Sequence, residues 1–158
     1  STPGIPFFDK LSIAINQANR NLWEPPMRKY IDECDLGVEG PRKKKFTMRW
    51  VGAMVMDIHR LGGRGGRLGY PVGSSLTGKG GRLRLMCEAN PMAFLVEQAG
   101  GIASTGYERI LDLAPEKLHQ RVPVIMGSTD EMKIILDNHK AFAKETGKEF
   151  THQCKNYA

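Results

Sequence analysis

The sequence RLRLMCEANPMAFLVEQAGG, residues 82–101, predicts a β-strand that runs directly into an α-helix. Its first half alternates in character with the period of a strand, and one face would carry Leu83, Leu85 and Cys87. Asn90 is then typical of a helix N-cap, and Pro91 of the first residue of a helix. Apolar residues follow at helical spacing until a glycine pair ends the helix, namely Met92, Leu95, Val96 and Ala99.

The opposite face of the predicted strand carries Arg82, Arg84 and, at its carboxyl end, Glu88. Ligands of open α/β sheets bind at this edge, helix N-termini favour anions, and arginine suits bidentate contact with phosphate. A glutamate beside a phosphate needs a cation between them, and Mg²⁺ is commonly held by carboxylates and phosphates together. The residues therefore permit a metal-assisted phosphate site. Alternation alone favours the simpler interpretation, in which the arginines are solvated and Glu88 forms an ion pair with one of them.

Composition indicates one globular domain. The chain has 158 residues, enough for a hydrophobic core, and we expect neither a membrane span nor a secretory signal at Ser1. Its cysteines, Cys34, Cys87 and Cys154, have no paired spacing. This argues against a disulfide framework or a zinc site and favours a reducing compartment, either the cytoplasm or the interior of an organelle. The net charge of +6 suits an anionic partner such as a sugar bisphosphate, a nucleic acid or an acidic protein.

Strands and helices are expected to alternate along the remaining sequence. Short strands are predicted at 11–15 and 122–127, and a strand or turn at 102–106. The strand at 122–127 contains Pro123, which favours the edge of a sheet. Such alternation is typical of a layered α/β domain, and we expect a mixed sheet of about five strands with helices on its faces. We expect this domain to occupy 1–145 and a polar, basic tail to occupy 146–158.

Three further helices are predicted. The first covers 24–34, and its buried face would carry Met27, Tyr30, Ile31 and Cys34. The second covers 50–61, with Arg49 at its start, and its apolar face would carry Val51, Met54, Val55 and Ile58. The third begins after Ser128, which has the spacing of a capping box with Glu131. Its apolar face would carry Met132, Ile135, Leu136, His139 and Phe142.

Three stretches are expected to be irregular. The basic run at 42–45 is typical of a solvated surface. The stretch GGRGGRLG at 62–69 is expected to end the second helix and form a flexible turn with an edge strand, because Gly69 weakens a buried strand. Gly-Arg runs also occur in RNA-binding segments, but one short run inside a globular fold favours the turn over nucleic-acid binding. Residues 72–81 are rich in glycine and serine and predict a loop.

The stretch LRLMCEANPMAFLVEQAGG resembles the signature of class I fructose-1,6-bisphosphatases, especially the proteobacterial type. The resemblance extends to INQANRNLWEPPMRKYIDEC, FTMRWVGAMVMDIHR and ERILDLAPEKLHQRVPVIMGS, so it covers the chain from about Leu11 to Asn138. It corresponds to the C-terminal half of the family's chain. It implies a role in carbohydrate metabolism, namely hydrolysis of the 1-phosphate of fructose 1,6-bisphosphate with Mg²⁺ or Mn²⁺, which polarises the phosphate and activates water.

The resemblance also implies roles for individual residues. Glu88 matches a metal-binding glutamate and Arg84 an arginine beside the reacting phosphate, so these two are the expected catalytic residues. Arg82 replaces a family lysine that contacts the sugar and its phosphate, which keeps the charge but changes the geometry. The other residues expected to bind substrate are Asn16, Asn19 and Tyr70, with Arg49 reaching the substrate of a neighbouring subunit. Considered alone, Asn16 predicts a cap in a polar loop, and Arg49 a surface residue.

Most metal-binding carboxylates of the family lie in its N-terminal half, and no D-P-x-D-G motif is present here. One interpretation is a phosphatase that needs this half, supplied as a separate chain. An alternative is a non-catalytic relative that binds sugar phosphates or serves as a structural subunit of a larger assembly. A third is a minimal phosphatase that acts as a homo-oligomer with atypical metal ligands.

Overall fold

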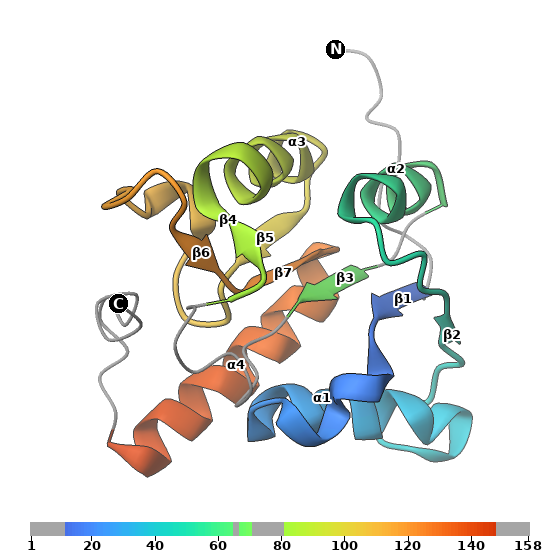
Figure 1. Cartoon of the computed structure of the whole chain (residues 1–158). Helices are drawn as coiled ribbons and strands as arrows, with labels where there is room; N and C mark the ends of the chain where they lie inside the picture. The colour runs from blue at the N-terminus through green and yellow to red at the C-terminus, as the bar shows by residue number, and fades with distance from the viewer. Residues whose placement is uncertain (1–11, 65–66, 71–80, 148–158) are drawn as a thin grey trace.

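The computed structural model describes residues 12–64, 67–70 and 81–147 of the chain. A five-stranded mixed sheet lies at its centre, in the order β2-β1-β3-β7-β5 (Figure 1). Its strands are β1 (Ser12–Ile15), β2 (Thr47–Met48), β3 (Arg67–Tyr70), β5 (Ile102–Ser104) and β7 (Val124–Gly127). A second sheet pairs β4 (Leu83–Arg84) with β6 (Arg121–Val122). The expected α/β fold with a mixed sheet of five strands is confirmed.

Two layers of helices cover the sheet. One layer contains α1 (Pro25–Asp35) and α4 (Thr129–Thr146), and the other contains α2 (Met54–Arg64) and α3 (Asn90–Gln98) (Figure 1). Successive residues of a strand point to opposite faces. Accordingly, Ile13 and Ile15 belong to the buried cluster under α1 and α4, whereas Ala14 belongs to the cluster under α2 and α3. Short helical turns connect these elements, at Gln17–Leu22, Gly37–Glu39 and Ile110–Asp112.

Strand β3 lies in the interior of the sheet, so the prediction of an edge strand around Gly69 is wrong. Gly69 pairs with Ile15 of β1 on one side and with Ile125 of β7 on the other. A Cβ atom at this position would lie 3.2 Å from Ile15 Cδ1 and 3.3 Å from Met27 Cε. The missing side chain therefore makes room for α1 to pack closely on the central strand.

Pro123 does not mark an edge strand either. It separates β6 from β7, at the point where the chain passes from the small sheet into the large one. Strand β7 itself lies between β3 and β5. The missing N–H of the proline therefore falls between two ladders and interrupts neither of them.

The prediction of a strand at 82–88 is correct only for Leu83–Arg84. Residues Leu85–Ala89 instead form a π-helical turn that continues into α3, and Asn90 has helical torsion angles rather than those of a cap. Leu83 and Leu85 are buried as the alternation required, but Cys87 is exposed. The next buried residues are Ala89, Ala93 and Val96, which are spaced as in a helix. Helical structure therefore begins at Leu85, before the end of the predicted strand. Gly100 follows α3 with a φ of 85°, and the helix ends there as expected.

The first and last predicted helices form with the expected buried residues, apart from half-buried Leu136 and Phe142 in α4. The second begins at Met54 instead of Trp50 and continues through both glycines to Arg64. Its predicted apolar residues Val51 and Val55 are both 56% exposed. In α3, Leu95 is likewise exposed, and Ala93 is buried in its place.

The predicted capping box at the start of α4 is wrong. Ser128 occupies the N-cap position, but its side chain makes no capping hydrogen bond. Glu131 instead turns into the protein, where it accepts a hydrogen bond of 2.9 Å from the Tyr30 hydroxyl and pairs with Arg42. Arg42 also lies over the rings of Tyr30 and Phe46. It is therefore not the solvated residue that the basic run predicted, whereas the three lysines after it are exposed.

Several predictions concern residues that the structure does not describe. Residues 72–80 of the predicted loop at 72–81, residues 148–158 of the predicted tail at 146–158, and Cys154 lie outside the described residues, whereas Thr146 ends α4. Cys34 and Cys87 are both free thiols, the first buried and the second exposed. Within the described ranges, no helix is both long and apolar enough to cross a membrane.

Candidate functional site

The ends of two parallel strands bring Asn16 and Tyr70 to one edge of the large sheet. Strands β1 and β3 are in register with Ile15 opposite Gly69, so the residues that follow these two leave the sheet side by side. Strand β7 begins at the same edge, because Tyr70 pairs with Val124. The small sheet lies next to it, since β6 runs into β7 through a single residue. Elements from separate parts of the chain thus adjoin at this end of the sheet.

Asn16 is the N-cap of the short turn that follows β1. Its Oδ1 atom accepts a hydrogen bond of 3.1 Å from the N–H of Ala18, which confirms the capping role expected from the residue alone. Asn19 lies in the same turn and is half-buried. The turn is held on α1 by Arg20, which pairs with Asp32 and lies 3.5 Å from Asp35. Both asparagines therefore have a fixed backbone at the edge of the sheet.

Arg84 and Glu88 form an ion pair, as the simpler interpretation of the sequence predicted. The Oε2 atom of Glu88 accepts a hydrogen bond of 2.7 Å from the backbone N–H of Arg84 and lies 3.9 Å from its Nε atom. The π-helical turn makes this contact possible by bringing Glu88 back over Arg84, whereas an extended strand would separate them. The side chains are 48% and 35% exposed, so the pair contributes little to stability.

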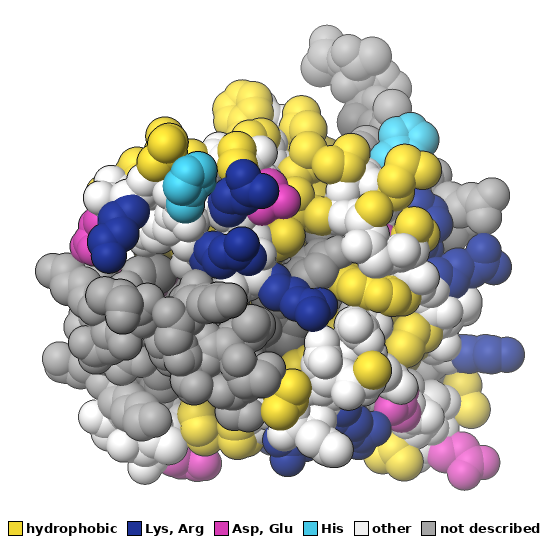
Figure 2. Space-filling view, in the orientation of Figure 1, with side chains coloured by type: hydrophobic (Ala, Val, Ile, Leu, Met, Phe, Trp, Pro, Cys, Tyr) yellow, Lys and Arg dark blue, Asp and Glu magenta, His cyan; other side chains and the backbone are white. Residues whose placement is uncertain are grey.

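Arg121 lies opposite Arg84 in the β4–β6 pair, although sequence reasoning did not select it. Its Nη1 atom donates a hydrogen bond of 2.8 Å to the backbone carbonyl of Arg82. All three arginines are exposed. Figure 2 shows Lys and Arg side chains gathered over the part of the surface where Figure 1 places β4 and β6, with an acidic side chain among them.

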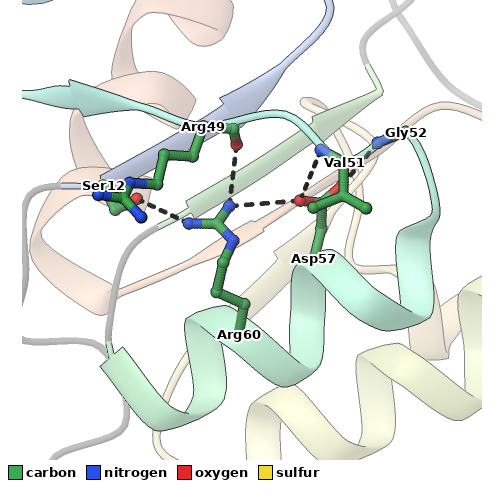
Figure 3. Close-up of polar contacts among 6 residues, drawn as sticks. All are labelled: Ser12, Arg49, Val51, Gly52, Asp57 and Arg60. Carbon is green, nitrogen blue, oxygen red and sulfur yellow. Dashed lines mark hydrogen bonds and ion pairs between the residues drawn. The ribbon is translucent and has the colours of Figure 1, made fainter.

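Arg49 lies apart from this group. It follows β2, and its backbone N–H donates to the carbonyl of Ile13 at 2.8 Å, so it sits beside the middle of β1. Figure 3 shows its side chain extending toward Ser12, the first residue of β1, and therefore away from the end at which Asn16 lies. The side chain is exposed and makes no ion pair with the described residues. It does not start a helix as predicted, because α2 begins five residues later.

A buried carboxylate holds the loop that follows Arg49. Asp57 is fully buried and accepts hydrogen bonds of 3.3 Å each from the backbone N–H groups of Val51 and Gly52 and from Arg60 (Figure 3). Arg60 also donates to the carbonyl of Arg49 at 2.9 Å and to the Ser12 hydroxyl at 3.2 Å. The loop is thus tied both to α2 and to the start of β1.

A pocket of about 420 Å³ lies away from these residues, beside the edge strand β5. Its lining includes Arg109, whose guanidinium donates to Glu97 and Asp112, and these hydrogen bonds raise its pKa. His139 lies nearby in the core, where burial lowers its pKa and Nδ1 lies 2.7 Å from the Ile135 carbonyl oxygen. None of the substrate-binding residues predicted from the sequence lines this pocket.

The described residues do not form a metal site by themselves. Within ranges 12–64, 67–70 and 81–147, no group of three or more His, Cys, Asp or Glu side chains is placed to hold a metal ion. Glu88 is the only predicted metal ligand, and its carboxylate contacts Arg84. One carboxylate does not provide the coordination that Mg²⁺ takes from carboxylates, phosphates and water together.

Comparison with known proteins identifies the chain's relatives. Residues 9–140 match the family model described as "Fructose-1-6-bisphosphatase, C-terminal domain". The chain is 56% identical over 126 residues to a class 1 fructose-1,6-bisphosphatase of Methylobacillus flagellatus, a match that covers 80% of this chain and 38% of that protein.

Solved structures give the same result. The holo form of Leishmania major fructose-1,6-bisphosphatase superimposes with a TM-score of 0.75 at 37% identity, over 82% of this chain and 39% of the other. The apo form of that enzyme gives 0.76 at 36% identity, over 84% and 40%. The chain therefore spans about two fifths of the length of each of these relatives.

Proposed function

Because the chain belongs to the family of the fructose-1,6-bisphosphatase C-terminal domain, we propose that it supplies the substrate-binding part of a sugar bisphosphatase. The reaction would be hydrolysis of the 1-phosphate of fructose 1,6-bisphosphate. One observation carries the proposal: Asn16 and Tyr70 stand where the paired strands β1 and β3 end, and the small sheet that carries Arg84 is joined to the same end of the large sheet through Pro123. Residues predicted from separate parts of the sequence thus belong to elements that adjoin at this end of the sheet.

The positive charge at this edge supports binding of a phosphate ester. Arg84 and Arg82 would contact the sugar and the reacting phosphate, since arginine offers a planar set of donors that suits phosphate. The distal phosphate would be bound by Asn16, Asn19 and Tyr70. Arg49 points away from its own site, which favours a contact with the substrate of a second subunit and hence a homo-oligomer.

Glu88 would provide one carboxylate for Mg²⁺ or Mn²⁺. Its ion pair with Arg84 is partly exposed and long, and such pairs contribute about 0–1 kcal/mol, so metal binding would mainly have to displace the 2.7 Å hydrogen bond from the Arg84 N–H. The remaining metal ligands would come from the part of the family's chain that this chain does not match. That part corresponds to about three fifths of the length of the relatives.

The outer side of the α2–α3 layer has the properties of a surface that binds another protein domain, which supports a role for the rest of the family's chain. Its exposed apolar residues, each 54–57% exposed, are Val51, Val55, Met56, Phe94 and Leu95. Figure 2 shows hydrophobic side chains over the region of α2 and α3. Exposed apolar patches of this kind mark interaction surfaces.

The opposite layer has a different surface. The exposed side chains of α1 and α4 are mostly charged, whereas no exposed side chain among those described in α2 and α3 is Asp, Glu, Lys or Arg. The α2–α3 layer is therefore the surface suited to a protein partner, and the occupant we propose is a folded domain formed by the first three fifths of the family's chain.

A second candidate function is binding of sugar phosphates without catalysis, as a subunit of a larger assembly. The observation that favours it is the lack of a metal-binding group among the described residues. The two functions predict the same affinity for fructose 1,6-bisphosphate and differ only in phosphate release.

The test measures phosphate release from fructose 1,6-bisphosphate with Mg²⁺. The purified chain is assayed alone and together with the N-terminal three fifths of the Methylobacillus flagellatus relative, produced separately. We expect release only from the mixture, its loss in Glu88→Gln, and no loss in Asp130→Asn, which removes an exposed carboxylate from the start of α4, at the opposite end of β7 from Val124. Binding of the sugar bisphosphate without release from any mixture would favour the non-catalytic function. Absence of both would refute the proposal.

A further inference from the structure

Resting on the proposed function, we propose that Arg121 is a phosphate-binding residue that acts together with Arg84. The two side chains would hold one phosphate group of the substrate between them. The inference begins from the pairing of β4 with β6, in which Arg84 lies directly opposite Arg121.

The hydrogen-bond pattern of this pair brings the two arginines close. The N–H of Leu85 donates to the carbonyl of Gln120 at 2.8 Å, just beyond the Arg84–Arg121 pair. In an antiparallel ladder this pattern makes Arg84 and Arg121 a non-hydrogen-bonded pair, the kind in which opposing side chains lie closest. Their Cβ atoms are then about 5 Å apart, and both side chains are on the same face.

Like charges placed directly opposite each other destabilise a strand pair. Glu88 is the carboxylate that contacts this group, and it contacts Arg84 rather than Arg121. The three arginines and one glutamate leave a local excess of two positive charges. A phosphate monoester carries about −1.5 to −2 charges at pH 7, so one bound phosphate group would neutralise this excess.

The donors of Arg121 are available for such a ligand. A guanidinium group carries five N–H donors, and the contact with the Arg82 carbonyl uses one of them. The other four make no hydrogen bond with the residues that the structure describes. Arg109 differs in this respect, because its guanidinium group already donates hydrogen bonds to the carboxylates of Glu97 and Asp112.

The backbone of Arg121 has a fixed position at the sheet edge. It is paired with β4 on one side, and three residues later the chain enters β7 in the interior of the large sheet. Binding a phosphate would therefore require little further ordering of the backbone. A donor that is already held in place binds more tightly than one that must first be ordered, because the ordering costs free energy.

The test is calorimetric titration of the purified chain with fructose 1,6-bisphosphate and, separately, with inorganic phosphate. We expect Arg121→Gln to weaken binding of both about tenfold and Arg121→Lys to restore only part of the loss, because lysine keeps the charge without the planar fork. Lys133→Gln on α4, which removes an exposed positive charge far from the site, should leave both affinities unchanged. Thermal unfolding without ligand should show that Arg121→Gln is no less stable, since it removes a like-charge neighbour of Arg84.

The outcomes separate this inference from the proposed function. If Arg84→Ala weakens binding while Arg121→Gln behaves as Lys133→Gln does, the role of Arg121 is refuted and the phosphate site stands. If the unsubstituted chain binds neither ligand, both the site and the role of Arg121 are refuted.

Discussion

Replacing Gly81 with alanine tests whether the small sheet is held against the large one as the structure describes. Gly81 lies two residues before β4, is buried and has a φ of 152°. A Cβ atom at this position would lie 2.2 Å from the carbonyl carbon of Val122 and 2.5 Å from the nitrogen of Pro123. Both are backbone atoms in the connection between β6 and β7, so no side-chain rotation can relieve the contact.

The structure gives the size of the effect. An ordinary contact is 3.4 Å or longer, so the backbones must separate by about 1.2 Å. Val122 cannot move that far without disturbing either its pairing with Leu83 or the start of β7. Overpacking typically costs about 1–3 kcal/mol and the unfavourable backbone conformation about 1–3 kcal/mol more. We therefore expect Gly81→Ala to lower the free energy of unfolding by about 2–6 kcal/mol.

The assay is urea denaturation followed by circular dichroism, with Gly100→Ala as the matched control. Gly100 also has a positive φ, of 85°, but no atom lies within 4 Å of an added Cβ. The control should thus cost only the conformational part, about 1–2 kcal/mol. If the two variants unfold at the same urea concentration, the close approach of Gly81 to Val122 does not exist and the reasoning is refuted.

Three further predictions concern buried polar groups. Glu131→Gln leaves the charge of Arg42 buried without its ionic partner, and a loss of about 3 kcal/mol is expected in urea denaturation. Asp57→Ala removes the acceptor of two backbone N–H groups and the partner of Arg60, and should cost about 3 kcal/mol in the same assay. Burial lowers the pKa of His139, so the unfolded chain binds its proton first as the pH falls below about 6.5. Unfolding free energy should fall by up to about 1.4 kcal/mol per pH unit there, and His139→Gln should reduce this slope; an unchanged slope would contradict it.

Patterns within a single element were enough to predict much of the fold. Helix α1 forms with its predicted buried face because two prolines fix its start and the apolar residues repeat at helical spacing. The class of the fold could be predicted for the same reason, since the alternation of strands and helices is visible along the sequence. The prediction failed for Gly69, because the reason for a glycine in a central strand is a contact with α1, which no pattern within β3 reveals.

The candidate site was harder to predict because strand pairing is a long-range property. Arg84 and Arg121 are separated by 37 positions, and only the pairing of β4 with β6 makes them neighbours. The sequence LHQRVPV places Arg121 directly before a predicted strand. Nothing in its local pattern, however, indicates that Arg121 lies beside Arg84. Glu131 shows the same limit, since its spacing from Ser128 suits a cap whereas its partners Tyr30 and Arg42 belong to a distant part of the chain.

The charges at the candidate site suit substrate binding better than metal binding. Phosphoryl transfer depends mainly on positioning and on stabilisation of charge on the phosphate oxygens. In the proposed function the described residues would provide the positioning, because the arginines and asparagines are attached to paired strands or to the turns that follow them. They provide positive charge, but a lone carboxylate paired with Arg84 is not a metal centre. Binding and catalysis should therefore be separable in this chain: Arg84→Ala should impair binding by the chain alone, whereas an effect of Glu88→Gln on phosphate release should emerge only in the complete assembly.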